Sequence, residues 1–467
     1  MNQPSFAYKK ITVLVMVIFS YYTSSAQAKL VVSGAKINMA SSVYLSTSDI
    51  SLSSGSTVNV ASSTIKIAGN MSSSGSLDVT NGTVETNGTG AQTIPANVFF
   101  TNTVRNLTVN NTAGVTMQGG LALTDVLTLG TGNLASNGYL TLKSTSVRTA
   151  RVAPVTSVAN VPISGDVIVE RYIPAKRAFR MLTAPLNSTT GIRANWMENT
   201  NNPSATVNND PVPGYGTHVT GIAANGFDVT NTLNPSMFTF DVSTQQWVAI
   251  PNTGVLYSAG AGYRILIRGS RSADLQSNTP PASITTLRAK GSLLTGTLVM
   301  AKPGGGGTSG MPQLSAATDG YSLLGNPYAS VLDWNAIQKT DISTTIYIFD
   351  PTLIGANGRG AYVSYNGTFL TNSNASSALD NNLQSGLAFF VQTTGPNPSI
   401  TIKETHKASA NRNVFRTANT IPQLSVQLLL PSQVNTAEAA DGFLVFFSEE
   451  FPNAISSEDS YKFSNQD

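Results

Sequence analysis

Short apolar segments separated by tight-turn residues fill the chain from Lys29 to about Ala150, and this spacing constrains the fold more than any other feature. Alternating pairs such as Ile37 and Met39 recur roughly every six to ten positions. Between them lie Ser-Gly, Asn-Gly and Gly-Thr pairs, which supply the positive φ angles of tight turns. Strands this short cannot each bury a face in a hairpin, but rungs stacked on one another bury a continuous apolar column.

We therefore predict an all-β protein that begins with a parallel β-helix, or solenoid, over residues 29–150, with about three strands per turn. A meander folded into a sandwich is the alternative. Only 11% of the residues are charged, compared with roughly 25% in an ordinary soluble domain. Surface polarity must come from Ser, Thr, Asn and Gly, which suit stacked ladders because like charges on adjacent rungs would repel.

Longer strand signals follow a Val-, Ala- and Pro-rich link, and they occur as two similar series. The stretch Phe179–Pro185 is echoed by Tyr321–Pro327. The later matches, in the same order, pair Met237–Asp241 with Ile346–Asp350, Gly262–Ile267 with Gly386–Val391, and Pro281–Thr285 with Pro398–Thr401. These patterns alternate, so they predict mainly antiparallel sheets with one buried face. We interpret the two series as a diverged tandem duplication of a β-sandwich, or jelly-roll-like, module.

The predicted organisation has seven parts. They are a signal peptide at residues 1–28, the β-helix at 29–150, a linker at 151–164, sandwich module 1 at 165–300, a Gly/Pro/Ser-rich linker at 301–320, sandwich module 2 at 321–407 and a terminal β segment at 408–467. Two further strands are expected in the last part, near Leu424–Leu429 and Phe443–Phe447. We expect this last part to be either a natural end or a truncation.

The N-terminus has the three parts of a secretory signal peptide. Lys9 and Lys10 precede the apolar run Ile11–Ser20, and a small-x-small site ends at Ala28. The apolar run is about half the roughly 20 residues that a membrane-spanning helix needs, and no later segment is long and apolar enough to span. We predict cleavage after Ala28 and a secreted or cell-surface protein.

Charge argues against nucleic-acid binding. The chain has 27 Lys and Arg against 24 Asp and Glu, and removal of Lys9 and Lys10 leaves 27 − 2 = 25 against 24. A nearly neutral mature chain lacks the concentrated basic face that displaces counterions from nucleic acid.

Side chains suited to catalysis are few and scattered. The chain has no cysteine and two histidines, His218 and His406, which lie in different modules. The predicted β-helix contains no histidine, and each of its acids falls in a different repeat; these acids are Asp49, Asp78, Glu85 and Asp125. Polysaccharide lyases and hydrolases built on β-helices need clustered acids. This favours a non-catalytic protein, with a carbohydrate-active β-helix enzyme as the alternative.

Six residues are candidate ligand contacts. Arg171, Lys176, Arg177 and Arg180 form the densest basic cluster; they serve either as charges that protect a sheet edge or as contacts to an anionic glycan.

Trp196 and Trp334 either fill the cores of the two modules or stack on sugar rings. Four aspartates near Gly and Asn either cap Asx turns or hold Ca²⁺; they are Asp241, Asp319, Asp333 and Asp350. No other cofactor is expected.

Three stretches, taken together with the signal peptide and the Asn/Gly-rich β-helix, resemble a known family. They are VIVERYIPAKRAFRMLTAP, GYRILIRGSR and YSLLGNPYASVLDW. The family comprises large secreted and cell-surface proteins of Bacteroidetes bacteria that cross the outer membrane by the type-nine route. The resemblance implies an adhesin-like protein that engages the export machinery. Members usually end in a C-terminal sorting domain, which is not evident after Phe447.

We therefore predict a secreted or surface-held, adhesin-like protein without catalytic residues. Its expected partners are surface glycans or host and cell-surface proteins, contacted through sandwich modules that the β-helix carries.

Overall fold

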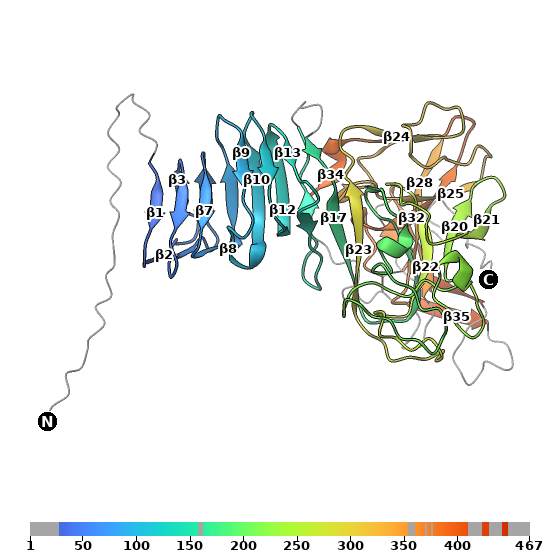
Figure 1. The fold of residues 1–467 in the computed structure, drawn as a ribbon. Helices are drawn as coiled ribbons and strands as arrows, with labels where there is room; N and C mark the ends of the chain where they lie inside the picture. The colour runs from blue at the N-terminus through green and yellow to red at the C-terminus, as the bar shows by residue number, and fades with distance from the viewer. Residues whose placement is uncertain are drawn as a thin grey trace.

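The computed structural model describes residues 28–156, 162–353, 360–368, 371–374, 377–409, 423–428 and 441–446. Within them the protein is all-β, as predicted, with a solenoid followed by packed antiparallel sheets (Figure 1). The helical residues in this described part form only short 3-10 turns, η1 (Phe100–Asn102), η2 (Ile192–Ala194), η3 (Ala223–Asn225) and η4 (Glu404–His406). The predicted signal peptide, apart from Ala28, lies outside the described residues.

The solenoid is a parallel β-helix, and its first two turns each contain three separate strands. These are β1 (Leu30–Val32), β2 (Lys36–Asn38) and β3 (Tyr44–Thr47), then β4 (Ile50–Leu52), β5 (Thr57–Asn59) and β6 (Thr64–Ile67). Each strand pairs in parallel with its counterpart in the next turn: β1 with β4, β2 with β5 and β3 with β6. The predicted β-helix, with three strands per turn, is confirmed.

In later turns some strands are long enough to bend at a corner of the β-helix and belong to two of its faces. These turns contain β7 (Met71–Ser73), β8 (Ser76–Thr86), β9 (Gln92–Ile94), β10 (Thr103–Asn110), β11 (Val115–Met117), β12 (Leu121–Thr131), β13 (Leu134–Ala135) and β14 (Leu140–Leu142). The first residues of β8 pair with β5 and its last residues pair with β6. One long strand therefore replaces two short ones.

The interior of the solenoid is a stack of aliphatic side chains. Val79, Val104, Leu123, Leu142 and Val169 occupy successive rungs in direct register, and none is more than 5% exposed. Each such side chain contributes roughly 1.5–3 kcal/mol of transfer free energy when it is buried. The column therefore supplies the stability that no single rung could supply alone.

The solenoid continues beyond the predicted boundary at Ala150. β15 (Arg151–Val152) pairs with β12, β16 (Ile163–Ser164) pairs with β13, and β17 (Val167–Ile173) pairs in parallel with β14. The residues that we assigned to a linker at 151–164 thus belong to the last turn where the structure describes them. Strands of two residues leave no detectable period in the sequence, which is why this stretch resembled a linker.

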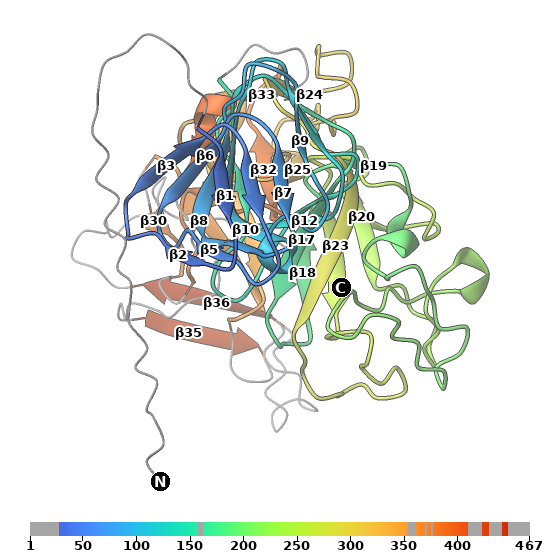
Figure 2. The same ribbon diagram turned by 60° about the vertical axis from the view of Figure 1, so that its left-hand side comes forward.

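An antiparallel strand closes this end of the solenoid. β23 (Thr285–Ser292) pairs with β17 along its whole length, and β19 (Asn187–Ser188) pairs with β23. Figure 2 shows β17 and β23 side by side behind the stacked rungs. Strands of module 1 therefore cover the edge that an uncapped parallel sheet would expose.

Each module has an inner sheet with one strand order. In module 1 the order is β18 (Ala178–Leu182), β22 (Tyr263–Ile267), β20 (Met237–Asp241) and β21 (Gln246–Ala249). In module 2 it is β25 (Tyr321–Gly325), β32 (Ala388–Thr393), β28 (Ile342–Asp350), β29 (Ala361–Asn366) and β30 (Thr371–Asn372). All neighbours are antiparallel, and equivalent strands come in the same order along the chain, as the predicted duplication requires.

Each module also has an outer sheet. In module 1 it is β17, β23 and β19; in module 2 it is β24 (Leu298–Ala301), β33 (Ser399–Ile402) and β27 (Gln338–Thr340). A further small sheet of module 2 contains β31 (Asn382–Leu383), β26 (Val331–Asp333) and β34 (Lys407–Ala408). The end of the chain contributes the hairpin β35 (Gln423–Leu428) and β36 (Asp441–Phe446), close to the two strands expected there.

The ladder register corrects one of the sequence matches. Leu182 pairs with Tyr263, and its counterpart Leu324 pairs with Phe389. Tyr263 is therefore equivalent to Phe389, two positions beyond the Leu387 that the sequence comparison matched to it. The apolar run around Phe389 fits more than one register, because both faces of this strand are buried.

The inner sheets pack against each other, which places four layers of strands in succession. Met181, Leu323 and Phe390 form a cluster between the two inner sheets. The next residues along two of these strands, Leu324 and Phe389, point into the core of module 2. Both faces of the module 2 inner sheet are therefore buried along β25 and β32, and this explains the nearly continuous apolar runs in these two strands.

Contacts between the modules are reciprocal. The Thr183 amide donates to the carbonyl oxygen of Gly386 at 3.1 Å, and the Gly325 amide donates to that of Gly260 at 2.6 Å. By the ladder register Thr183 is equivalent to Gly325, and Gly260 is equivalent to Gly386. Contacts of i with j and of j with i are the signature of a two-fold interface, so the modules are related by a pseudo-two-fold axis.

The boundary between the modules also differs from the prediction. Residues 293–297 join β23 to β24, whereas the predicted linker at 301–320 lies within module 2, between β24 and β25. Its Gly-rich loop packs back on β24, because the Thr308 amide donates to the Val299 carbonyl at 2.8 Å. The glycines had suggested a linker, but they form a tight loop.

Two polar joints fix the solenoid to the modules. Lys143, on the solenoid, contacts Glu170 at 2.6 Å and the Tyr215 hydroxyl at 3.1 Å. At the other joint, Glu404 accepts hydrogen bonds from the backbone amides of Val155 and Gly296, both at 2.8 Å. Module 1 and module 2 are thus each tied to the last turn. No helix in the described part of the chain is long and apolar enough to cross a membrane.

Candidate functional site

The four basic residues singled out in the sequence lie around the turn that joins β17 to β18. A fifth, Arg268, follows β22 and acts electrostatically on Arg177. We name Arg171, Lys176, Arg177, Arg180 and Arg268 the basic cluster. The sequence comparison missed Arg268 because 88 residues (268 − 180) separate it from Arg180, and only the β18–β22 ladder brings the two strands together.

Arg180 supports the turn from beneath. It is 2% exposed, and its Nη2 donates to the carbonyl oxygens of Pro174 and Lys176 at 3.3 and 3.4 Å. Burial, with the charge of Arg171 adding to it, lowers the pKa of Arg180 to about 10. This residue positions the turn and does not itself present its charge to solvent.

Arg171 is a tie between the modules. Its Nη1 donates to the carbonyl oxygen of Ser385, in module 2, at 3.0 Å. Burial lowers its pKa to about 10, and its Nε is buried without a hydrogen-bond partner.

Lys176 and Arg177 form the outward side of the cluster, and Arg268 lies buried next to them, because Ala178 pairs with Ile267 in the β18–β22 ladder. Arg177 is exposed and Lys176 is half-buried, and both burial and the charge of Arg180 lower the pKa of Lys176. Arg268 is 9% exposed, its Nη1 lacks a hydrogen-bond partner, and burial, then Arg177, lowers its pKa to about 10. The turn therefore concentrates positive charge at one place on module 1.

Among the residues that the structure describes, two acids act on the cluster, Asp228 on Arg268 and Asp350 on two other members. Asp350, at the end of β28, acts on both Lys176 and Arg180. Its Oδ1 already accepts from Thr352, and its Oδ2 accepts from the Ser377 hydroxyl at 2.6 Å. This carboxylate is thus shared between capping a turn and balancing two cations.

Trp196 and Trp334 fill the cores of the two modules, which is the first of the two roles considered for them. Trp196 is 3% exposed and its ring centroid lies 4.7 Å from that of Tyr257. Trp334 is fully buried, and its Nε1 donates to the Thr344 carbonyl at 2.6 Å. Neither ring presents a face to solvent on which a sugar could stack.

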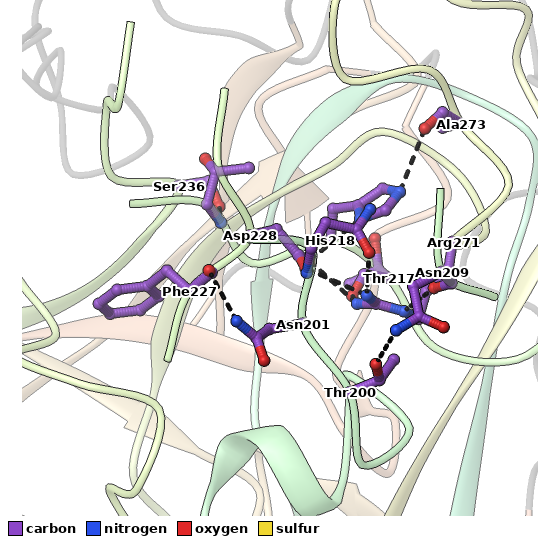
Figure 3. A network of polar contacts seen from close by, with 12 residues as sticks. Thr200, Asn201, Asn209, Thr217, His218, Phe227, Asp228, Ser236, Arg271 and Ala273 are labelled. Carbon is purple, nitrogen blue, oxygen red and sulfur yellow. Dashed lines mark hydrogen bonds and ion pairs between the residues drawn. The ribbon is translucent and has the colours of Figure 1, made fainter. Parts of the chain in front are cut away.

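A buried ionic network holds the loops of module 1 together (Figure 3). His218, Asp228 and Arg271 are all fully buried. Asp228 accepts from Arg271 through both carboxylate oxygens, at 2.9 and 3.1 Å, and its Oδ2 lies 3.0 Å from His218 Nδ1. The other ring nitrogen of His218 lies 3.1 Å from the Ala273 carbonyl oxygen. No sequence motif marks this network, because His218 and Asp228 lie in the long connection between β19 and β20 and Arg271 lies in the segment after β22.

The network stabilises the ionised form of the Asp228 carboxylate relative to its protonated form. Burial alone would raise the pKa of Asp228, but its hydrogen bonds with His218 and Arg271 more than offset this and hold the pKa below its usual value. The second histidine, His406, lies apart in module 2 and accepts a hydrogen bond from the Lys403 amide through Nδ1. The side chains of His218, Asp228 and Arg271 are all fully buried. The network therefore holds the loops of module 1 together, and none of these three side chains is accessible to a substrate.

The acids of the solenoid are engaged in contacts along the stack. Glu85 pairs with Lys66 at 2.9 Å, and Asp125 pairs with Arg105 at 3.0 Å. Asp49 accepts from the Asn70 amide, and Asp78 accepts from Thr80. Each carboxylate therefore stabilises its own rung or a neighbouring one.

The aspartates considered for Ca²⁺ mostly cap turns. Oδ1 of Asp241, Asp333 and Asp350 each accepts from the amide two residues ahead, as in an Asx turn. Asp319 contacts the Gln392 amide nitrogen at 3.5 Å. Among the residues that the structure describes, no group of three or more His, Cys, Asp or Glu side chains is arranged to hold a metal ion.

Comparison of the chain with protein-family models, with curated proteins and with solved structures finds no match.

Proposed function

We propose that this is a non-catalytic, adhesin-like protein of the cell surface or exterior, which contacts polysaccharides or other surface ligands through its paired sandwich modules. The observation that carries the proposal is the continuous joining of the β-helix to the module pair. β17 is at once the last strand of the solenoid stack and a strand of the outer sheet of module 1. The rod and its head therefore form one body (Figure 1).

The polar joints support this proposal. Lys143 and Glu170 connect the solenoid to module 1, and Glu404 of module 2 accepts a hydrogen bond from the Val155 amide in the last solenoid turn. Glu170 is the buried member of the first pair, with 2% of its side chain exposed against 26% for Lys143, so loss of Lys143 would leave a buried charge uncompensated. A head held in this way presents its outer loops in a fixed orientation relative to the rod, which suits contact with an extended surface.

The occupation of the solenoid acids also supports a binding role. Glu85 and Asp125 are each committed to an ion pair with a basic residue on a neighbouring rung. Both carboxylates are therefore occupied in holding rungs together, whereas glycoside hydrolysis requires a pair of acids that flank the scissile bond.

The N-terminal sequence supports location outside the inner membrane. The basic start, the apolar run and the Ala-Gln-Ala site are those of an export signal. Together with the family resemblance, they support export by the type-nine route to the cell surface or medium.

Purified protein incubated with a panel of neutral and acidic polysaccharides, with and without Ca²⁺, tests the proposal. We expect retention of at least one polysaccharide in affinity electrophoresis without release of reducing ends or unsaturated products. Product release that a single Asp or Glu substitution abolishes would instead establish a carbohydrate-active enzyme.

A further inference from the structure

We propose that the open N-terminal end of the β-helix binds the same end of a second copy of this chain, so that two rods join end to end. The surface is the first turn, which contains β1, β2 and β3. The proposal does not depend on which ligand the modules contact.

The first support is that this end has three open strand edges. In the ranges that the structure describes, β1, β2 and β3 pair only with strands of the following turn, and they lie at the end of the rod away from the modules (Figure 1). At the opposite end the chain covers the last parallel strand, β17, with the antiparallel strand β23. Cleavage after Ala28, as the sequence predicts, would leave Lys29 alone ahead of β1, so no leader would remain to cover this end after export.

The second support is the residue types on the outward positions of the first turn. Val31 and Tyr44 are the counterparts of Ser51 and Thr64 in the second turn, and they are 61% and 72% exposed. Lys36 is the one charged residue in the three strands. A solvated edge is usually protected by charge, whereas a β-branched and an aromatic side chain suit contact with another strand.

The third support is that the apolar column is incompletely buried at this end. Leu30, Ile37 and Leu45 pack against the core but are only partly buried. Their counterparts one turn further along are at most 1% exposed. Another turn stacked on this end would complete the burial, as each inner turn does for its neighbour.

The step at the end of a helix indicates which partner fits. The chain advances along the rod by one strand spacing in each turn, roughly 4.8 Å, so β1 lies outermost and β3 lies furthest in. A second copy related by a two-fold axis through the middle of β2 has the same step in reverse order. β1 then meets β3 of the second copy, β2 meets β2, and all three pairs have the same separation. A single strand from another protein would fill one of the three edges and leave the step exposed.

The two-fold axis also sets the register. It reverses the chain direction, so each pair is antiparallel, as β17 is with β23. With Ile37 on the axis, Lys36 faces Asn38 of the second copy and not another lysine. Val31 lies 37 − 31 = 6 residues before Ile37 and Tyr44 lies 44 − 37 = 7 residues after it, so these two meet across the interface as an aromatic and β-branched pair. The joined rods carry a module pair at each outer end, which raises affinity for a repetitive surface through multivalency.

Cysteine cross-linking tests the register, because the natural chain contains no cysteine. Exported chains that carry Val31→Cys or Tyr44→Cys are purified separately, mixed and oxidised. We expect a disulfide-linked pair in the mixture and little in either chain alone, because each cysteine meets the other position of the second copy at a distance that a disulfide can bridge. Val147→Cys, at a position 61% exposed like Val31, replaces Val31→Cys in the control mixture and should not link.

Analytical ultracentrifugation of the exported chain measures the association itself. Three short strand edges form a small interface, so we expect a dimer with a Kd of about 1–100 μM. Val31→Lys should weaken the dimer about tenfold or more, because a charge on an edge strand opposes pairing, whereas Val147→Lys should leave it unchanged. Circular dichroism confirms that both variants keep the fold.

Three results would overturn the proposal. A chain that stays monomeric up to about 1 mM, well above the expected Kd, has no such interface. Equal association by Val31→Lys and the wild type places the contact elsewhere. Linkage of Val31→Cys with itself as efficient as in the mixture rules out the two-fold axis through β2.

Discussion

The two sandwich modules match closely where they face each other and differ where they face away. At the interface, Phe240 and Trp247 of module 1 lie with ring centroids 5.4 Å apart at 76°, and the equivalent Phe349 and Tyr362 lie 5.3 Å apart at 80°. Each inner sheet packs on the other, so a change in one must be accommodated by its partner. The packing of the two inner sheets on each other therefore keeps the equivalent side chains of the two modules in the same arrangement.

Away from the interface the modules use different chemistry. Residues 189–236 join β19 to β20 in module 1, whereas Asp341 alone joins the equivalent β27 to β28 in module 2. This long connection is rich in Asn, Thr, Gly and Pro, and it places only scattered apolar side chains, such as Trp196 and Phe227, in the core. It is fixed in addition by Asp228, which binds both Arg271 and His218. Module 2 relies on apolar packing around Trp334.

The largest expected effect comes from removing the carboxylate on which the loops of module 1 depend. Asp228→Asn leaves Arg271 and His218 buried without a counter-charge, so we expect a loss of about 3–5 kcal/mol in the free energy of unfolding. Chemical denaturation of the full chain, followed by tryptophan fluorescence, measures it. Asp241→Asn, at an exposed Asx turn of the same module, is the control and should leave the midpoint nearly unchanged. Equal effects would show that the network does not hold module 1.

A smaller effect tests the pseudo-two-fold axis directly. A Cβ built on Gly325 would lie 2.4 Å from the Cβ of its equivalent, Thr183. Gly325→Thr should therefore overpack the interface and destabilise the protein by about 1–3 kcal/mol. The exchange Thr183→Gly/Gly325→Thr moves the same side chain across the axis.

If the axis holds, the double variant should regain most of the stability that Gly325→Thr loses, as thermal denaturation would show. Thr183→Gly alone is the matched control for the lost side chain. Additive losses in the double variant would mean that the two sites are not equivalent.

Acid should weaken module 1 through the same carboxylate. The pKa of Asp228 in the folded state lies below its usual value of 3.8, because of the hydrogen bonds with His218 and Arg271. The stability that Asp228 contributes is therefore complete above pH 3.8 and is lost as pH falls from about 3.8 towards the folded-state pKa. We expect the stability difference between wild type and Asp228→Asn to be constant from pH 7 to pH 5 and to narrow below pH 4. Denaturation series at each pH measure it, and a difference that grows on acidification would contradict the assignment.

The sequence predicts the repeats well because their signal is local. The alternating residues of the solenoid face a single column, so spacing alone places Val104 and Leu123 inside. The duplicated strands are also recognisable, and their order was correct. The exact register at Phe389 was not, because a strand buried on both faces has no alternation to fix it.

The basic cluster was only partly predictable from the sequence, because its members come from strands that are far apart along the chain. Lys176, Arg177 and Arg180 are neighbours in the chain and could be grouped by inspection. Arg268 reaches them only through the pairing of β18 with β22. The two tryptophans were ambiguous in the sequence, because an indole ring suits both a core and a sugar surface, and only their burial decides between these roles.

The smallest expected effect tests whether the modules are interchangeable at single aromatic positions. Trp247 packs edge-on against Phe240 and against Phe390 of module 2, with ring centroids 5.4 and 5.6 Å apart. Its equivalent in module 2 is Tyr362, so Trp247→Tyr gives module 1 the ring that module 2 already carries. We expect a loss below about 1 kcal/mol, because the smaller ring keeps the edge-on contact with Phe240. Trp247→Ala removes the ring and is the comparison, with a clearly larger loss expected in the same denaturation experiment. Equal losses for Tyr and Ala would show that the indole is needed for a contact that module 2 does not reproduce, and would limit the equivalence of the modules to their backbones.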